Sequence, residues 1–419
     1  MTRREALLSV ASGVTAATGA QQTMVADDTW PTFARGPART GYTADDIGPK
    51  KSLASAWRVE TDRPVLSPAL AGGMIYFGSY DGSCYALDAT DGNELWRTSL
   101  ESRGVVGSPT VVNKTVYLLG RGTPESGSLY ALNKETGAKR WQTELGTTIV
   151  DNTPAVVDGT AYVGDGDGVV HALDASDGTE RWRYRADDEV TTAPAVASGT
   201  VYIGSWDESV YALDAADGAE HWVFESEAVI DGAPAVANET VYVGSSDSQV
   251  YALDADSGTT RWTTDVDAAV RGSPAVGGGT VYVGAGSAIV ALDAATGRQQ
   301  WMFNTGSQIS SAPVVAGSTV YIGSRETTLY ALDPETGREY AAFNPGNVLT
   351  PADQDRISRG EAAAVGDGQV YVPTSNGQLY ALGTSGEDTF LSDLTTLGIA
   401  GGLTVGVGAW LYRRKQRSR

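Results

Sequence analysis

The chain has 419 residues, with 51 acidic and 30 basic side chains and a formal net charge of −21. This balance argues against nucleic-acid binding, which needs a basic face. The chain has one cysteine, Cys84, so no internal disulfide bond can form.

The N-terminal residues predict an export signal. Met1-Thr-Arg-Arg-Glu-Ala-Leu-Leu places paired arginines ahead of a modest apolar stretch over residues 6–20, and it resembles the twin-arginine export motif. We therefore expect a signal peptide over residues 1–26. A lead-in segment over residues 27–50 then precedes the folded domain.

A motif of about 40 residues recurs eight times between residues 51 and 383. Its type sequence is Tyr211-Ala-Leu-Asp-Ala-Ala-Asp-Gly-Ala-Glu-His-Trp222. The copies begin at Tyr85, Tyr130, His171, Tyr211, Tyr251, Val290, Tyr330 and Tyr380. A fixed period of this length indicates an array of similar supersecondary units.

Each unit predicts four short strands, because β-branched and aromatic runs alternate with turn residues. In the fifth unit these strands cover residues 232–237, 241–244, 250–254 and 261–264. We expect the motif's Asp to bond the backbone of its own turn and the following Gly to adopt a positive φ. A Trp is expected to pack between neighbouring units. These tryptophans are Trp57, Trp96, Trp141, Trp182, Trp222, Trp262 and Trp301, and the seventh unit departs with Ala341.

Four-stranded units repeated radially form a β-propeller. The eighth copy supplies no fourth strand, whereas residues 53–60 carry Trp57 ahead of the first full unit. We predict that this N-terminal strand completes the last blade and closes the ring, which removes an open sheet edge. The predicted fold is all-β, an eight-bladed β-propeller of four-stranded blades over residues 51–383.

The motif ALDxxTGxxxW, preceded by SPAV and VYVGS, resembles the PQQ-like repeat of quinoprotein dehydrogenases and of BamB-type propellers, which are not enzymes. Trp30-Pro-Thr-Phe-Ala-Arg-Gly also resembles the segment that leads into such propellers. The resemblance implies that each Trp docks on the Ala-containing strand of a neighbouring repeat. The dehydrogenases of this family typically hold a vicinal Cys-Cys disulfide against the cofactor, and this chain has no such pair.

The C-terminal residues predict a membrane anchor. After a linker at residues 384–393, residues 394–412 carry no charge and, as a helix, would span about 28 Å. The basic tail over residues 413–419 favours a cytoplasmic C-terminus. We expect a single-pass protein of the cell membrane with an extracellular propeller. Its high Asp and Glu content and six lysines resemble proteins of halophilic archaea.

Specificity is expected at one end of the ring, where two insertions at residues 121–127 and 344–360 should open. The same end should display the residues two positions before each Ser/Ala/Thr-Pro pair. These residues are Val65, Val106, Asp151, Thr191, Asp231, Arg271 and Ser310. Asp151, Asp231 and Arg271 are candidates for holding a small polar ligand or a cation, and the alternative is a hydrated channel mouth. Trp206, in a repeat turn, is the candidate aromatic for stacking a cofactor.

Other motifs suggest little chemistry. His171 and His221 occupy ordinary repeat positions, which argues against a His-based metal site and a Ser-His-Asp triad. Asp165-Gly-Asp-Gly168 is similar to the start of a calcium loop but lacks its glutamate, so we predict a tight turn. Asn113 and Asn238 begin N-glycosylation sequons at turns.

The leading hypothesis is a non-catalytic binding or scaffolding module at the cell surface, with no cofactor and a protein, glycan or small ligand as partner. The alternative that the resemblance implies is a PQQ-dependent dehydrogenase that oxidises an alcohol or sugar. It would stack PQQ on an aromatic such as Trp206 and hold calcium with carboxylates such as Asp151 or Asp231. A third hypothesis is purely structural support of a surface layer.

Overall fold

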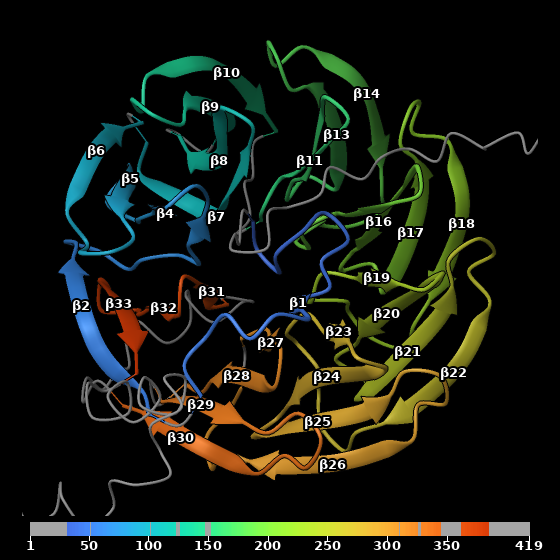
Figure 1. Cartoon of the computed structure of the whole chain (residues 1–419). Coiled ribbons are helices and arrows are strands. Elements are labelled where there is room, and N and C mark those ends of the chain that lie inside the picture. The colour runs from blue at the N-terminus through green and yellow to red at the C-terminus, as the bar shows by residue number, and fades with distance from the viewer. Residues whose placement is uncertain are drawn as a thin grey trace, which may run out of the picture.

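The computed structural model describes residues 32–50, 52–100, 102–122, 126–146, 152–309, 311–325, 328–344 and 362–384. Within these ranges all regular elements are strands, arranged as eight sheets around an axis (Figure 1). The predicted signal peptide, transmembrane helix and basic tail lie outside the described residues, as does the predicted linker except for Thr384. In the part of the chain that is described, no helix has the length and apolar character needed to cross a membrane.

The first four blades are regular antiparallel sheets. Blade 1 holds β3 (Ala69–Leu70), β4 (Met74–Gly78), β5 (Ser83–Asp88) and β6 (Glu94–Ser99). Blade 2 holds β7 (Gly104–Val112), β8 (Thr115–Arg121), β9 (Gly127–Asn133) and β10 (Lys139–Leu145). Blade 3 holds β11 (Ala155–Val157), β12 (Thr160–Gly164), β13 (Val169–Asp174) and β14 (Glu180–Arg185). Blade 4 holds β15 (Ala195–Ala197), β16 (Thr200–Gly204), β17 (Ser209–Asp214) and β18 (Glu220–Glu225).

The last four blades continue the ring. Blade 5 holds β19 (Ala235–Ala237), β20 (Thr240–Gly244), β21 (Gln249–Asp254) and β22 (Thr260–Asp265). Blade 6 holds β23 (Ala275–Gly277), β24 (Thr280–Ala285), β25 (Ala288–Asp293) and β26 (Gln299–Asn304). Blade 7 holds β27 (Val314–Ala316), β28 (Thr319–Gly323), β29 (Leu329–Leu332) and β30 (Glu339–Phe343), and β1 (Tyr42–Thr43) pairs with β27 in parallel. Blade 8 holds β31 (Ala364–Gly366), β32 (Gln369–Pro373), β33 (Gln378–Gly383) and β2 (Ala54–Glu60).

The ring closes as predicted. β2 pairs antiparallel with β33, with Arg58 opposite Tyr380, so the N-terminal strand is the fourth strand of blade 8 (Figure 1). The first strands of neighbouring blades contact one another around the whole ring and therefore line its axis. β19 is shorter than predicted and begins at Ala235, because Pro234 has no N–H for a ladder and Gly232 is pressed against Gly272 of the next blade.

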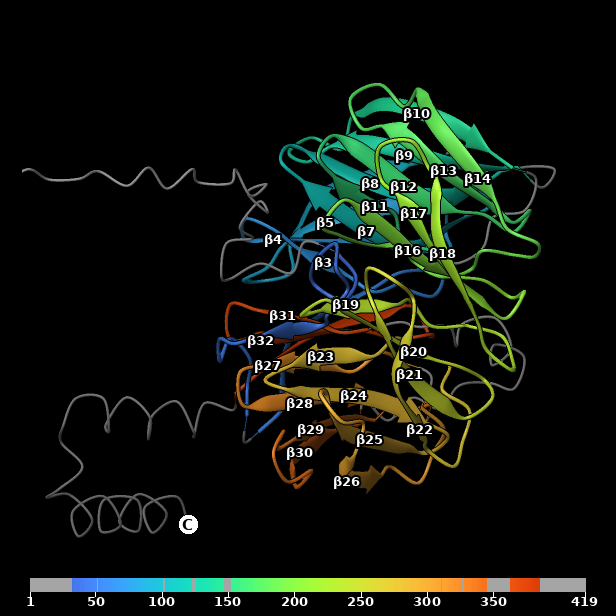
Figure 2. The ribbon, with the colours of Figure 1, turned by 90° about the vertical axis from the view of Figure 1, so that its right-hand side faces the viewer.

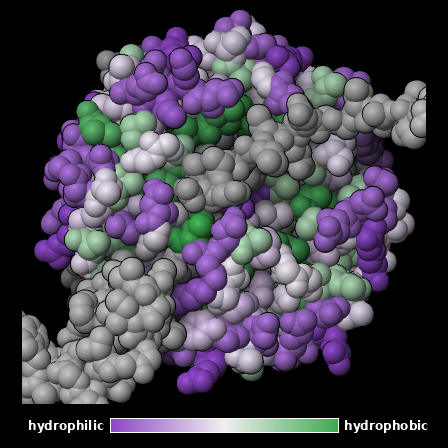
Figure 3. Space-filling model, viewed as in Figure 1, coloured by the Kyte–Doolittle hydropathy of each residue, from purple (hydrophilic) through white to green (hydrophobic). Residues whose placement is uncertain are grey.

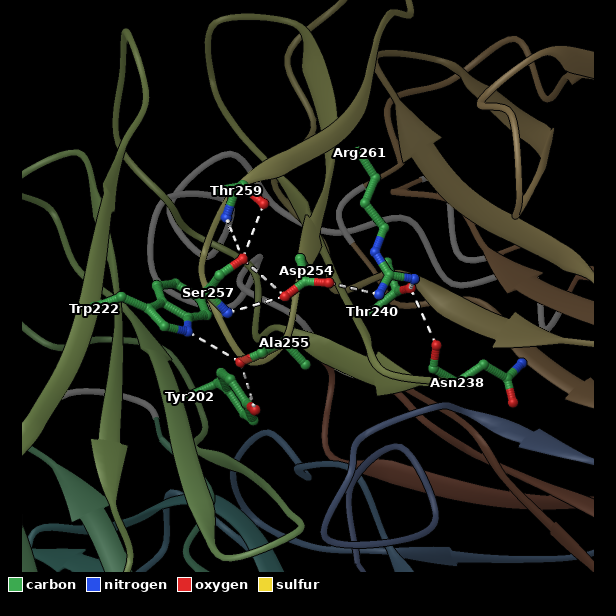
Figure 4. A network of polar contacts seen from close by, with 9 residues as sticks. All are labelled: Tyr202, Trp222, Asn238, Thr240, Asp254, Ala255, Ser257, Thr259 and Arg261. Carbon is green, nitrogen blue, oxygen red and sulfur yellow. Dashed lines mark hydrogen bonds and ion pairs between the residues drawn. The ribbon is translucent and has the colours of Figure 1, made fainter.

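Each junction with a tryptophan uses the same contacts. Between blades 4 and 5, Trp222 Nε1 donates to the carbonyl of Ala255 at 3.0 Å, and the Tyr202 hydroxyl donates to the same oxygen at 3.2 Å (Figure 4). A Cβ on Gly258 would lie 2.7 Å from the Trp222 ring, and the φ of Gly258 is +70°, so glycine is required there. All seven predicted tryptophans make the equivalent bond, to the residue after the motif's Asp or, in the second unit, after Asn133.

The motif's Asp organises the turn that receives the tryptophan. One carboxylate oxygen of Asp254 accepts the N–H and the hydroxyl of Ser257, and the other accepts Arg261 at 2.7 Å (Figure 4). Arg261 also donates to Thr240 Oγ1 at 2.7 Å. The hydrogen bonds from Arg261 and Ser257 lower the pKa of Asp254 to about 2. The predicted roles of Asp, Gly and Trp in the repeat are therefore confirmed at this junction.

The junction between blades 7 and 8 is built differently, because Ala341 stands where the tryptophan would be. Tyr321, the counterpart of Tyr202, donates at 2.5 Å to the carbonyl of Pro49 in the lead-in segment. Tyr340 instead bonds Asp333 within its own blade at 2.6 Å. The lead-in thus supplies the acceptor that a neighbouring blade supplies elsewhere.

The lead-in over residues 32–50 crosses the middle of the ring and lies between the blades on either side of the axis (Figures 1 and 2). Its carbonyls accept backbone N–H groups from the first strands of blades 4 to 7, at Val196, Val236, Val276 and Val315. Phe33 lies in one cluster with buried alanines of several blades. The axis is therefore filled by the protein's own chain.

Buried tyrosines predict an alkaline limit to stability. Burial raises the pKa of Tyr202 and Tyr242, and it raises that of Tyr282 to about 12. The unfolded value is about 10, so the neutral form is favoured in the fold, and its stabilisation is complete below pH 10 and lost as the pH rises towards 12. We expect the free energy of unfolding, from denaturant titrations at pH 8 to 11, to fall only above pH 10. A rise through pH 10 to 11 would contradict this, since it would mean that the lowered pKa of Arg39 outweighs the tyrosines.

Candidate functional site

The two ends of the ring differ in their loops. One end, the turn face, carries the tight turns within hairpins, such as residues 238–239 and 255–259. The other end, the loop face, carries the connections between blades together with the turns between second and third strands. On the loop face the backbone N–H of Trp206, in a turn between second and third strands, donates to the carbonyl of Glu189, in a connection between blades, at 2.9 Å. Both kinds of loop therefore lie on one face, whereas most residues of the two predicted insertions lie outside the described residues.

The turn face is closed by the lead-in. Asp46 accepts the N–H and hydroxyl of Ser318, and the Gly368 N–H donates to the carbonyl of Ile47, both at turns of this face. In the view of the face that the lead-in crosses, hydrophilic residues surround the periphery and hydrophobic residues form small separate patches (Figure 3). The lead-in therefore lies against the turn face of the ring.

Arg39 links the lead-in to the blades from inside the ring. Its side chain is fully buried, and burial lowers its pKa to about 9, so it carries a positive charge at neutral pH. Its guanidinium makes five hydrogen bonds of 2.8–3.1 Å, all to neutral oxygens. The acceptors are Thr32 Oγ1 and the carbonyls of Phe33, Thr153, Pro154 and Pro194. All its N–H groups donate to protein oxygens, so Arg39 is a structural residue. Four of its five acceptors are backbone carbonyls, which have no sequence signature, so its role could not be predicted from the motifs.

The structure brings two of the predicted site residues together on the loop face. Trp206, in the turn of blade 4, donates its indole N–H to Asp231 Oδ1 at 3.1 Å. Ser246, in the corresponding turn of blade 5, donates to Asp231 Oδ2 at 3.3 Å. The Asp231 carboxylate is therefore oriented on the loop face by side chains from two blades.

The other candidates lie around this carboxylate with different roles. Arg271 occupies the equivalent position one blade further and is exposed. Thr191, one blade before Asp231, is buried, and its hydroxyl has no hydrogen-bond partner. Val65 and Val106 are fully buried core residues. Asp151 and Ser310 lie outside the described residues.

Blade 3 has a polar pair that sequence analysis did not predict. Asp165 Oδ1 accepts the N–H groups of Asp167 and Val169, so this segment forms the expected tight turn. Asp165 Oδ2 contacts His171 Nε2 at 2.8 Å, and both side chains are buried. His171 stands where Tyr211 bonds Asp207 in blade 4, but the counterpart of Asp207 is Asp167, so the motif alignment would have pointed to a different carboxylate.

The donor set for calcium and PQQ can be tested on the residues described. Within those ranges no three His, Cys, Asp or Glu side chains gather in a way that could hold a metal ion. The oxygens of Asp231 are oriented by Trp206 and Ser246, and Cys84 is buried alone. Asp151, the other carboxylate proposed for calcium, lies outside the described residues, and the site for PQQ and calcium stays a prediction.

The sequons lie on exposed turns of the turn face. Asn113 and Asn238 both have positive φ angles and exposed side chains. This geometry makes both amides accessible, and glycosylation stays a prediction.

Fold and site together define an eight-bladed β-propeller with the lead-in packed along its axis and with polar residues that differ from blade to blade on its loop face. The chain belongs to the family of the outer membrane protein assembly factor BamB, whose model matches residues 50–142, 125–246 and 206–341. The predicted BamB-like and PQQ-like repeat is thereby confirmed.

Three known proteins place this result in context. BamB from Moraxella catarrhalis is 21% identical, with a TM-score of 0.67, over 80% of this chain and 98% of that one. The quinohemoprotein alcohol dehydrogenase from Comamonas testosteroni is 15% identical, with a TM-score of 0.71, over 85% of this chain and 81% of that one. Serine/threonine-protein kinase AfsK from Streptomyces coelicolor is 51% identical over 39 residues, and the chain spans 5% of that protein's length. The structural likenesses establish the fold alone.

Proposed function

We propose that the protein is a non-catalytic binding module at the outer side of the cytoplasmic membrane, anchored by its C-terminal residues, and that its loop face takes a protein or glycan partner or a small ligand. The observation that carries this proposal is the Asp231 carboxylate, oriented on the loop face by Trp206 and Ser246. A preoriented polar group on a rigid ring suits recognition. The lead-in on the opposite end supports the choice of face.

A pull-down from the membrane fraction tests this function. The full-length protein is compared with a loop-face variant, Trp206→Ala with Asp231→Asn and Arg271→Gln. The control is a turn-face variant, Asp158→Asn with Glu239→Gln, which changes exposed residues at the other end. We expect one partner to be retained by the wild type and the control and lost by the loop-face variant. Equal retention by all three would reject the loop face as the binding surface.

The second candidate function is a PQQ-dependent dehydrogenase, which the likeness to a quinohemoprotein alcohol dehydrogenase favours. A titration of PQQ into the protein, with and without calcium and followed by tryptophan fluorescence, separates the two proposals. Saturable quenching that requires calcium and weakens in Asp231→Ala would favour the dehydrogenase. On the binding-module proposal we expect no saturable response.

A further inference from the structure

Asp231 and Arg271 lie side by side on the loop face. They hold the same repeat position in blades 5 and 6, and the segments that follow them touch. The Ala233 N–H donates to Ser273 Oγ at 2.8 Å, and a Cβ on Gly232 would lie 2.6 Å from the carbonyl oxygen of Gly272. The acidic and the basic residue therefore flank a close contact between two backbones.

The two opposite charges are not paired with each other. The hydrogen bonds to Asp231 come from the neutral donors Trp206 and Ser246. Arg271 is exposed, and the ion pairs found among the described residues include neither Arg271 nor Asp231. Elsewhere on the ring, Arg181 and Arg261 pair with nearby aspartates at 2.8 and 2.7 Å. On the loop face a carboxylate and a guanidinium from neighbouring blades are thus left without an ion pair.

We propose that these two residues bind a small zwitterion of the free amino-acid class, with its ammonium group on Asp231 and its carboxylate on Arg271. An ammonium can donate to the spare lone pairs of Asp231, and a guanidinium binds a carboxylate through two parallel N–H donors. A ligand with only one charge leaves one protein charge unmatched. Trp206 acts as a positioning residue for Asp231. This inference rests on the proposed binding function of the loop face.

Glycine and its two single-charge analogues test the proposal on the full-length protein. Binding is followed by calorimetry and by tryptophan fluorescence, since Trp206 contacts Asp231. We expect glycine to bind saturably. Glycinamide, which lacks the carboxylate, and N-acetylglycine, which lacks the ammonium, should each bind at least about tenfold more weakly, because each loses one charge-assisted contact.

The variants assign each half of the ligand. Asp231→Asn should weaken glycine at least about tenfold and leave N-acetylglycine unchanged, whereas Arg271→Gln should weaken glycine and leave glycinamide unchanged. Arg63→Gln, which removes another exposed arginine of the loop face, is the matched control and should change nothing. Trp206→Phe keeps an aromatic ring without the N–H, and a weaker glycine affinity in it would separate positioning of Asp231 from a role in folding.

Two results would overturn this ligand class: no saturable glycine binding by the folded protein, or equal binding of glycine and both analogues. The pull-down distinguishes this failure from failure of the proposed function. A partner lost only in the loop-face variant, without glycine binding, would reject the zwitterion and leave the binding face standing. Loss of both signals would reject both.

Discussion

Arg39→Leu is expected to lower the free energy of unfolding by about 3–5 kcal/mol, because several buried neutral acceptors lose their only charged donor. The substitution leaves acceptors from the lead-in, blade 3 and blade 4 buried without donors, each costing about 1–3 kcal/mol. Relief of the desolvation that lowers the pKa of Arg39 offsets part of the loss. Unfolding by guanidinium chloride, followed by tryptophan fluorescence, measures this change in the free energy of unfolding.

The lead-in offers its own control for this experiment. Lys50 forms an exposed ion pair with Asp46 at 2.5 Å, so Lys50→Ala removes a cation from the same segment without emptying a buried site. We expect a change below about 1 kcal/mol. Limited proteolysis adds a local measurement, because loss of Arg39 should release residues 32–50 for cleavage before the ring unfolds. An Arg39→Leu protein as stable and as resistant as the wild type would mean that the guanidinium does not hold the lead-in.

The repeat could be predicted because the motif whose residues make these contacts recurs eight times in the sequence. Trp222 and Gly258 recur at fixed spacing, and each recurrence marks the same indole-on-turn packing. Ring closure could be predicted from Trp57, because the motif's tryptophan, which the eighth unit lacks, occurs in a strand ahead of the first full unit. Local turn chemistry at Asp254 needed only the preferences of Asp and Gly.

The lead-in contacts could not be predicted in the same way. Arg39 reaches the carbonyl of Pro194, 155 positions away, and Tyr321 reaches that of Pro49, 272 positions away. Every residue has a backbone carbonyl, so the residue types at these acceptor positions do not mark the contact. The hydrogen bond between Trp206 and Asp231 could be predicted only in part. Both residues differ from their counterparts in other repeats, but no sequence pattern indicates that they contact each other.

Trp222→Ala is expected to destabilise the protein by about 3–5 kcal/mol, the usual cost of removing a buried large aromatic side chain. The indole is 8% exposed, packs against Tyr202 and Gly258, and donates to the carbonyl of Ala255. Trp222→Phe should cost less, since it loses the hydrogen bond but keeps most of the packing. Denaturant midpoints of the two variants and the wild type give the comparison.

Trp206→Ala is the matched control, because the same residue type is removed from the same blade. Trp206 lies on the loop face with its indole N–H on Asp231, and it is only half-buried. We expect its loss to cost below about 1 kcal/mol, the worth of an ordinary hydrogen bond, while changing ligand binding at Asp231. If Trp206→Ala destabilised the ring as much as Trp222→Ala, the division of the two tryptophans into one for binding and one for folding would be wrong. Similar stability of Trp222→Ala and wild type would instead show that a junction without tryptophan, as in blade 7 with Ala341, needs no compensation by the lead-in.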